Sequence, residues 1–213
     1  MGRPALTEEE FAAGRDRTCE VALELFGKGG RDAVTLRAIS GVLGCSPMQP
    51  YRYFPGGKNE ILAEVKTKAF NHFAEHQEQM LENGIDNDID FVETYGAGYV
   101  RYARDNPASF RIMFELEPFP EDEYPELAAA SARARGPALT AIKRLIESGV
   151  LVGDHRQIGK VLWASVHGLA TLHLTSQLAH EAEIDELSPL LIRTLRAGIL
   201  SFSRPRPGQS EHP

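Results

Sequence analysis

The sequence predicts an all-α protein with a small N-terminal domain and a larger helical domain behind it. Apolar residues recur at three- and four-residue steps along most of the chain, which is the period of an α-helix. Alternating patterns typical of strands are nearly absent, and Gly and Pro clusters separate the helical stretches. We find no segment that repeats at a period of roughly 20–50 residues, so a repeat array is not indicated.

The first expected helix begins with a capping-box pattern made by Thr7 and Glu10. Its inward face is expected to carry Phe11, Thr18, Val21, Ala22, Leu25 and Phe26. Gly27 opens the string Gly-Lys-Gly-Gly and is expected to end the helix, because glycine readily adopts the left-handed conformation of a C-cap.

Two short helices joined by a turn at Gly44 are expected next. Thr35 is the expected N-cap of the first. Ser46 is the expected N-cap of the second, with Pro47 at the first helical position, where no amide donor is needed. Two short helices joined in this way over about residues 35–54 match a helix-turn-helix.

The rest of the chain keeps the helical pattern. Further helices are expected at about 58–82, 88–105, 107–115, 124–148, 155–179 and 186–203. The expected domains are a helix-turn-helix DNA-binding domain over 5–66, a larger helical domain over 67–203, and a Pro- and Gly-rich disordered tail over 204–213.

Charge is distributed unevenly along the chain. The net charge is −7, but residues 1–70 carry ten Lys/Arg against nine Asp/Glu, whereas residues 71–213 carry thirteen against twenty-one. An acidic body discourages indiscriminate binding to DNA and still permits a local basic surface near the N-terminus to act. No apolar run approaches the roughly 18 residues that span a bilayer, and the N-terminus lacks a signal-peptide pattern. Cys19 and Cys45 fit a reduced compartment, so a cytoplasmic location is expected.

In a helix-turn-helix, the second helix enters the major groove and presents its N-terminal residues to base edges. Gln suits adenine and Arg suits guanine, while hydroxyl and lysine side chains suit phosphates. The residues expected to contact DNA are Thr35, Arg37, Ser46, Met48, Gln49, Tyr51, Arg52, Tyr53 and Lys58. Pro50 falls at the fourth expected helical position and biases Gln49 away from helical dihedral angles, so whether Gln49 faces a base stays open. The alternative for this stretch is an aromatic-rich surface loop without a ligand.

The string "VTLRAISGVLGCSPMQPYRYFPGGKNEILAEV" resembles the DNA-binding region of the tetracycline-repressor (TetR) family, over residues 7–66 in all. The matching positions are Thr35, Ala38, Ile39, Gly44, Ser46, Tyr51, Tyr53, Phe54 and Lys58. Many members have His where Tyr53 stands, and Gly56 and Gly57 replace a more usual polar pair. The segment "WASVHGLATL", residues 163–172, resembles the Trp-His-Gly segment of one group of C-terminal domains in this family.

The resemblance implies an all-α homodimer that binds a palindromic operator in double-stranded DNA. It also implies that residues 67–203 form the helical effector-binding and dimerisation domain. It also implies a repressor that a small molecule in the C-terminal domain releases from DNA. A regulator that a protein partner controls, without a small molecule, is the alternative.

The last two helices carry more apolar surface than two terminal helices usually bury alone, so a two-fold partner is expected to cover part of it. The expected dimer-interface residues are Ile158, Leu162, Leu169, Leu191, Leu195, Ile199 and Phe202. The alternative is that all of these residues pack internally.

An effector pocket is expected among aromatic residues of the larger domain. The candidates are Tyr95, Tyr99, Tyr102, Phe110, Met113, Phe114, Trp163 and His167. Their helical spacing equally fits ordinary core packing, with His167 as a polar handle or a satisfied core histidine.

The string "HFAEH" matches the inverted zinc-protease signature, with His72 and His76 on one helical face and Glu75 as a base. A zinc hydrolase is therefore a remote alternative, although no third ligand pairs obviously with this string. The sequence contains no phosphate loop, nucleophile elbow or convincing nucleophilic triad. We therefore expect no enzymatic activity, no metal and no cofactor.

Overall fold

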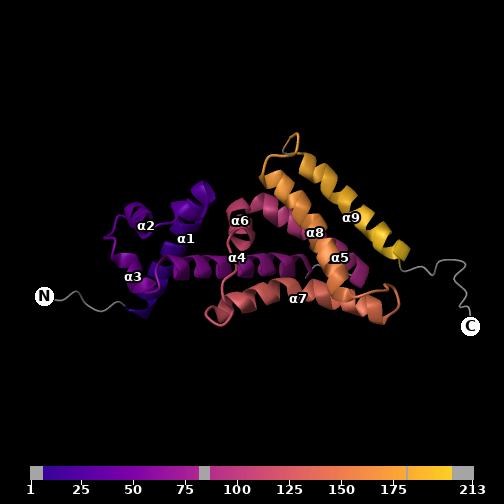
Figure 1. Ribbon diagram of the computed structural model, residues 1–213, viewed down its shortest axis with the longest axis horizontal. Coiled ribbons are helices and arrows are strands. Elements are labelled where there is room, and N and C mark those ends of the chain that lie inside the picture. The colour runs from indigo at the N-terminus through magenta and orange to yellow at the C-terminus, as the bar shows by residue number, and fades with distance from the viewer. Residues whose placement is uncertain (1–6, 82–86, 181, 203–213) are drawn as a thin grey trace, which may run out of the picture. The chain divides into compact units, whose positions relative to one another are not determined.

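The computed structural model describes residues 7–81, 87–180 and 182–202, and every regular element in them is an α-helix (Figure 1). The helices are α1 (Glu8–Ala33), α2 (Leu36–Leu43), α3 (Gln49–Tyr53), α4 (Lys58–Leu81), α5 (Asp88–Asp105), α6 (Pro107–Glu115), α7 (Pro125–Glu147), α8 (His155–Leu174) and α9 (Glu183–Phe202). The predicted all-α fold class is confirmed. In the described part of the chain, no helix combines the length and apolar character that crossing a membrane requires.

The chain divides into two compact units. Unit 1 contains Met1–His72 and Asn106–Ala132, and unit 2 contains Phe73–Asp105 and Arg133–Pro213. The predicted domain limits at 5–66 and 67–203 remain predictions, and the predicted disordered tail at 204–213 lies outside the described residues.

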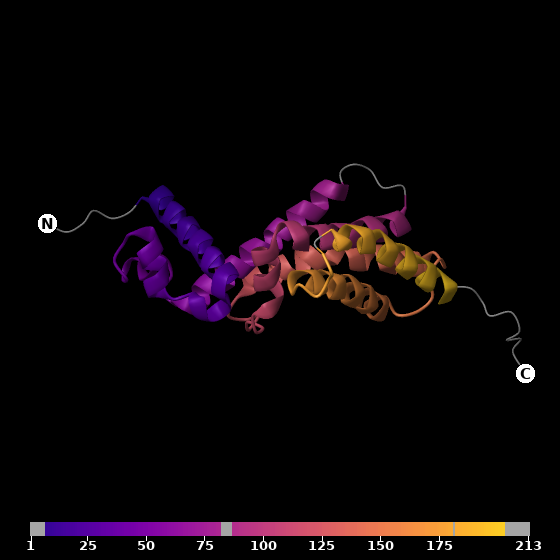
Figure 2. The same cartoon turned by 90° about the horizontal axis from the view of Figure 1, so that it is seen from above.

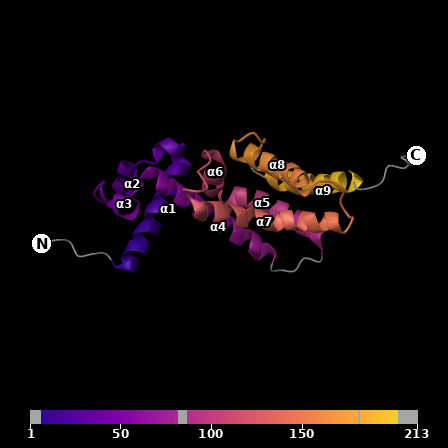
Figure 3. The same ribbon diagram turned by 60° about the horizontal axis from the view of Figure 1, so that its bottom comes forward.

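Unit 1 contains α1, α2, α3, the first part of α4, and α6. Helices α2 and α3 lie against each other and against α1 (Figure 3). Phe26, Ile39, Phe54 and Ile61 come from four different segments and are almost completely buried, so burial of apolar surface holds these short helices together.

Unit 2 is built around α5, α8 and α9, which pack on one another. Figure 2 shows α9, in yellow, running alongside α8, in orange. Tyr102 of α5 is fully buried, and Val166 and Leu169 of α8 are also buried. A separate apolar cluster forms around Ile142 and Leu145 of α7.

Most observed helix limits lie within three residues of the expected ones, but α8 ends at Leu174, five residues before the expected limit. Two expected caps are also wrong. Helix α1 continues through Gly27 and is interrupted at Gly29 and Gly30, where Gly30 has a φ of 65°. A Cβ on Gly27 would lie 3.2 Å from that of Ala108 in α6, so this glycine serves close helix packing instead of a cap.

The second error concerns the start of α3. Ser46 is not the N-cap: its carbonyl oxygen accepts a hydrogen bond from Gln49 N at 2.9 Å within a turn, and Met48 is the residue before the helix. Pro50 therefore lies in the first turn, where its missing amide costs nothing. The turn ahead of the helix, which the sequence pattern did not reveal, moves Pro50 from the fourth helical position to the second, and Gln49 is helical although a proline follows it.

Candidate nucleic-acid interface

A helix-turn-helix is formed by α2, the turn after it, and α3. The Thr35 hydroxyl caps α2 by accepting a hydrogen bond from Ala38 N at 3.0 Å. Gly44 ends the helix with φ 65° and ψ 32°, a left-handed conformation that suits glycine. Cys45 N then donates to Ser40 O at 3.0 Å, which fixes the direction of the chain into the turn. The caps at Thr35 and Gly44 were both readable from the sequence.

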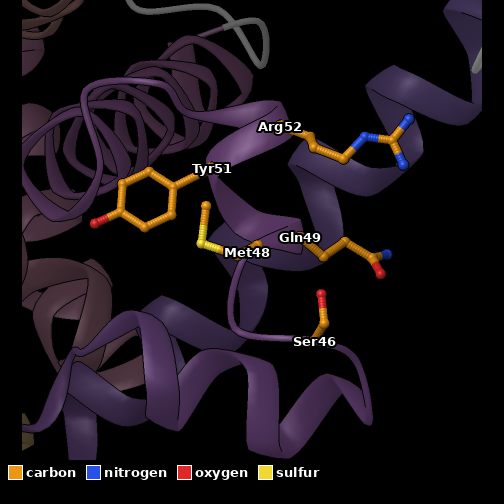
Figure 4. A pocket seen from close by; sticks show the side chains of 5 residues that line it. All are labelled: Ser46, Met48, Gln49, Tyr51 and Arg52. Carbon is orange, nitrogen blue, oxygen red and sulfur yellow. The ribbon is translucent and has the colours of Figure 1, made fainter.

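Exposed side chains cluster on and just before α3. Met48 is 67% exposed, Tyr51 is 41% exposed, and Ser46 and Arg52 are also exposed. Together with the half-buried Gln49 they line an open surface pocket of about 270 Å³. Figure 4 shows Gln49 and Arg52 extending to the same side of α3, with the Tyr51 ring on the opposite side. The helix therefore presents an amide and a guanidinium together, as the three-residue spacing requires.

Tyr53 differs from the other predicted DNA-contacting residues because it is only 7% exposed. Its ring meets Phe11 of α1 edge-on at 5.6 Å between centroids. A Cβ on Gly14 would lie 2.3 Å from the Tyr53 Cζ atom, so the ring occupies space that only glycine leaves open. The structure thus places Tyr53 beneath α3, where it fastens the helix to α1.

The remaining predicted DNA contacts flank α3. Arg37 is exposed on α2, and Lys58 is half-buried at the first residue of α4. The loop before Lys58 turns at Gly57, with φ 68°, and Gly56 N donates to Glu60 Oε2 at 2.7 Å. A glycine turn and a hydrogen bond to a carboxylate therefore fix the conformation of this loop. Two glycines stand here in place of the polar pair that is more usual in the TetR family, which this segment resembles.

Arg15 and Gly14, both on α1, contact α3 and were missed in the sequence. Arg15 Nη1 donates to Tyr53 O at 2.7 Å, and Arg15 Nη2 donates to Glu64 Oε2 at 2.9 Å. A glycine inside a helical pattern signals close approach of another element, so Gly14 could have been found. Arg15 carried no such signal, because its partners lie 38 and 49 residues away.

Within unit 2, three predicted pocket residues form a hydrogen-bonded cluster. Trp163 Nε1 donates to Tyr99 Oη at 3.1 Å, and Tyr99 Oη lies 2.8 Å from His167 Nδ1. Burial lowers the pKa of His167 and raises the pKa of the Tyr99 hydroxyl. The Tyr99 hydroxyl is therefore suited to donate to a neutral imidazole.

The other predicted pocket residues are packed in two separate places. In unit 2, Tyr102 meets the Phe73 ring at 5.0 Å between centroids, and Tyr95 Oη donates to the Ala134 carbonyl. In unit 1, the ring centroids of Phe110 and Phe114 are 4.9 Å apart, and Met113 is buried. The structure thus brings Tyr99, Trp163 and His167 together and places the rest in core packing, so the effector pocket remains a prediction.

The predicted dimer residues are mostly half-buried within one copy of the chain. Ile158, Leu162 and Ile199 pack against the apolar cluster of α7, and Leu169 is buried. Leu191 and Leu195 are half-buried on α9, and the side chain of Phe202 lies outside the described residues.

A different apolar face is exposed on α8 and α9. Val161 is 60% exposed and Leu190 is 51% exposed, and Leu172 is exposed as well. Ala164 and Gly168 lie between the apolar residues of α8, where Ala164 is exposed and a Cβ on Gly168 would meet nothing within 4 Å.

The "HFAEH" string lies on α4. Its Glu75 Oε1 is 3.8 Å from Arg133 Nη1, and the His76 ring is tilted against that of Tyr102 at 5.5 Å between centroids. Within residues 7–81, 87–180 and 182–202, no three His, Cys, Asp or Glu side chains gather so that they could hold a metal ion.

One family model matches part of the chain. Residues 92–195 match the family model described as the tetracyclin repressor-like C-terminal domain. No curated protein matches the sequence.

Solved structures share the fold at low sequence identity. A protein of unknown function from Rhodococcus sp. RHA1 is 20% identical with a TM-score of 0.75, covering 88% of this chain and 95% of its own. A TetR family transcriptional regulator from Thermus thermophilus is 22% identical with a TM-score of 0.63, covering 84% and 98%. A ketosteroid transcriptional regulator from Mycobacterium tuberculosis is 15% identical with a TM-score of 0.61, covering 87% and 94%.

Proposed function

We propose that this chain is a cytoplasmic, TetR-family transcriptional regulator that binds a palindromic operator as a homodimer, without cofactor or enzymatic activity. The observation that carries the proposal is α3, which follows a helix-turn-helix turn and exposes Gln49 and Arg52 on one side. A buried helix would not present these polar groups, and a surface loop would not be held by Tyr53 and Phe54 in the core.

Base reading is assigned to Gln49 and Arg52. A bidentate amide–adenine or guanidinium–guanine pair discriminates against a wrong base by about 1–3 kcal/mol. Because the two side chains are three residues apart, they reach neighbouring base pairs from one helix face. Ser46 and Met48, exposed in the turn before α3, are placed to contact the same groove.

Phosphate binding is assigned to groups around α3. Lys58 stands at the start of α4, where its charge and the free backbone amides both favour an anion. Thr35 marks the start of α2, which offers free amides in the same way, and Arg37 follows within its first turn. The Tyr51 hydroxyl, on the opposite side of α3 from Arg52, is a further donor.

A homodimer is required to present α3 twice. The exposed apolar face of α8 and α9 supports the proposal, because Val161, Leu172 and Leu190 would otherwise remain in water. Ala164 and Gly168 keep α8 narrow between these residues, which lets a two-fold partner helix approach closely. The half-buried predicted interface residues would lie beneath this face.

Release from the operator is assigned to a small molecule that acts on unit 2. The cluster of Tyr99, His167 and Trp163 supports this assignment, since it is a polar group set among aromatic rings. A ligand that prefers the non-binding form by about 2.7 kcal/mol changes operator occupancy about a hundredfold. Helix α4 carries Lys58 at its start and Phe73, which meets Tyr99 and Tyr102, in its second half. It is therefore the element assigned to transmit the change.

The DNA assignment is tested by selecting duplexes from a random-sequence library with the full-length protein and measuring affinity for the enriched duplex. Arg52→Ala should relax the preference at particular base pairs, because it removes a base contact. Tyr51→Ala should weaken binding to every duplex by a similar factor, because it removes a phosphate contact. If both variants bind every duplex as tightly as the unmodified protein, α3 is not the DNA-contacting element.

A further inference from the structure

Helix α3 is too short to hold its own position. It has five residues, from Gln49 to Tyr53, and a single helical turn is unstable in water without external contacts. At its end Phe54 N closes a helical hydrogen bond, donating to Pro50 O at 2.9 Å. The orientation of α3, and with it the direction of Gln49 and Arg52, therefore depends on the residues that contact it.

Arg15 of α1 binds the C-terminal end of α3 through a hydrogen bond and a cation–π contact. Its Nη1 atom donates to the Tyr53 carbonyl at 2.7 Å, one of the last carbonyls of a helix, which have no intrahelical partner. Its guanidinium carbon lies 4.1 Å from the centre of the Phe54 ring, in cation–π geometry. A hydrogen bond from a charged donor is about twice as strong as a neutral one, so this contact stabilises the position of the end of α3.

Two carboxylates of α4 anchor Arg15 from the other side. Nη2 donates to Glu64 Oε2 at 2.9 Å, and Nη1 lies 3.5 Å from Glu60 Oε1. The guanidinium is half-buried and thus partly shielded from water. One planar group therefore joins α1, the end of α3 and α4, and both of its terminal nitrogens have a fixed partner.

We infer that Arg15 is a positioning residue for DNA reading: it fixes the end of α3 against α1 and α4 and so sets where Gln49 and Arg52 meet the base pairs. The inference rests on the proposed DNA-binding function, in which Arg15 itself touches no DNA. Lysine cannot replace it, because an ammonium group lacks the planar fork that serves a carbonyl and a carboxylate in fixed directions at once.

The test compares two full-length variants. Arg15→Lys keeps the charge and loses the fork. Asp16→Asn is the matched control: it breaks the neighbouring ion pair between Asp16 of α1 and Lys68 of α4 and leaves α3 untouched. The probes are the duplex that the unmodified protein enriches from a random library and the same duplex with one base pair of the half-site replaced.

The readout is the ratio of the dissociation constants for these two duplexes. A partly unfolded variant weakens binding to both duplexes by the same factor, so the ratio does not respond to a loss of stability alone. We expect Arg15→Lys to lower the ratio about tenfold, the discrimination of one lost bidentate base contact. We expect Asp16→Asn to leave it unchanged. An unchanged ratio in Arg15→Lys, or an equal loss in both variants, overturns the inference.

Amide hydrogen exchange of the free protein supplies a second readout that needs no DNA. In Arg15→Lys, the peptide covering Gln49–Phe54 should exchange faster, with the α2 peptide unchanged. If exchange becomes equally faster in both peptides, or faster in neither, Arg15 does not hold α3 in place. If the unmodified protein enriches no duplex, the proposed function fails, and the exchange result still decides whether Arg15 holds α3.

Discussion

At the residue scale, the contact between Gly14 and Tyr53 shows how one absent side chain positions a helix. The Tyr53 ring lies where a Cβ on Gly14 would be, with Phe11 against its edge. The ring is therefore held from two sides by α1. A glycine in a helix interior costs about 1 kcal/mol relative to alanine, and here that cost is offset by close packing of α3.

Gly14→Ala should destabilise the protein by about 1–3 kcal/mol, because the added methyl group would overlap the Tyr53 ring. Urea unfolding monitored by circular dichroism measures the change. In a Tyr53→Leu background the same substitution should cost much less, since the overlapping atoms are gone. Equal costs in both backgrounds would show that the ring is not held against Gly14.

His167 should make stability depend on pH. Burial lowers its folded-state pKa below the ordinary value near 6.5, so the unfolded chain binds more protons between the two pKa values. The contribution of the neutral imidazole is therefore complete above about pH 6.5 and is lost as the pH falls through the folded-state pKa. Urea unfolding at about pH 7.5 and 5.5 should show a larger loss for the unmodified protein than for His167→Gln. The same loss in both would exclude His167 as the cause.

At the element scale, the helices themselves were the most predictable feature of the chain. The caps at Thr7, Thr35 and Gly44 were found because each depends on a residue type at a fixed position in its own segment. The predicted start of α3 was wrong. Serine is a residue type typical of N-caps, but the carbonyl of Ser46 instead accepts the hydrogen bond that closes a turn.

The extent of α1 was missed for another reason. Gly27 packs against α6, and the local sequence does not distinguish a glycine that serves such a contact from a glycine that ends a helix. Arg15 was missed in the same way. Within the candidate interface, the exposed residues of α3 could thus be predicted from the sequence, and Arg15, which contacts the end of that helix, could not.

The start of α4 carries a prediction about salt. Lys58→Ala should lower the slope of log affinity against log salt by about one unit and weaken binding to all duplexes alike, because one phosphate contact is lost. Fluorescence anisotropy of the enriched duplex at several salt concentrations measures the slope. Lys28→Ala is the matched control, since Lys28 is an exposed lysine of α1 paired with Glu24. Equal slopes in the Lys58 variant and the unmodified protein would place Lys58 away from the DNA.

At the scale of the whole molecule, the acidic net charge and the proposed DNA-binding function are compatible because the charge is divided along the chain. Residues 1–70 carry a net +1, from ten basic and nine acidic residues, and the remaining residues carry −8. In the proposed function, the acidic body opposes non-specific association with DNA, while the local cations near α3 favour the operator. The sequence did not reveal which apolar residues of α8 and α9 are exposed, because Val161, Leu172 and Leu190 are as apolar as the residues that pack inside one copy.

Gly168→Arg should convert the proposed dimer into a monomer. A Cβ at Gly168 meets nothing within 4 Å, so a single copy tolerates the substitution, whereas a partner helix packed on this face does not. Analytical ultracentrifugation measures the mass. Gly41→Arg is the matched control, because Gly41 is an exposed helical glycine of α2 whose Cβ would also meet nothing within 4 Å. A dimeric Gly168→Arg protein would place the two-fold contact elsewhere.

The most direct test of the proposed mode of action is the sequence that the full-length protein enriches from a random duplex library. Two copies of α3 in a symmetric dimer predict an inverted repeat with half-site centres about 10–10.5 base pairs apart, or a near multiple, and loss of the enriched bases with Arg52→Ala. Enrichment of no sequence, or of a single asymmetric site by the unmodified protein, would contradict it.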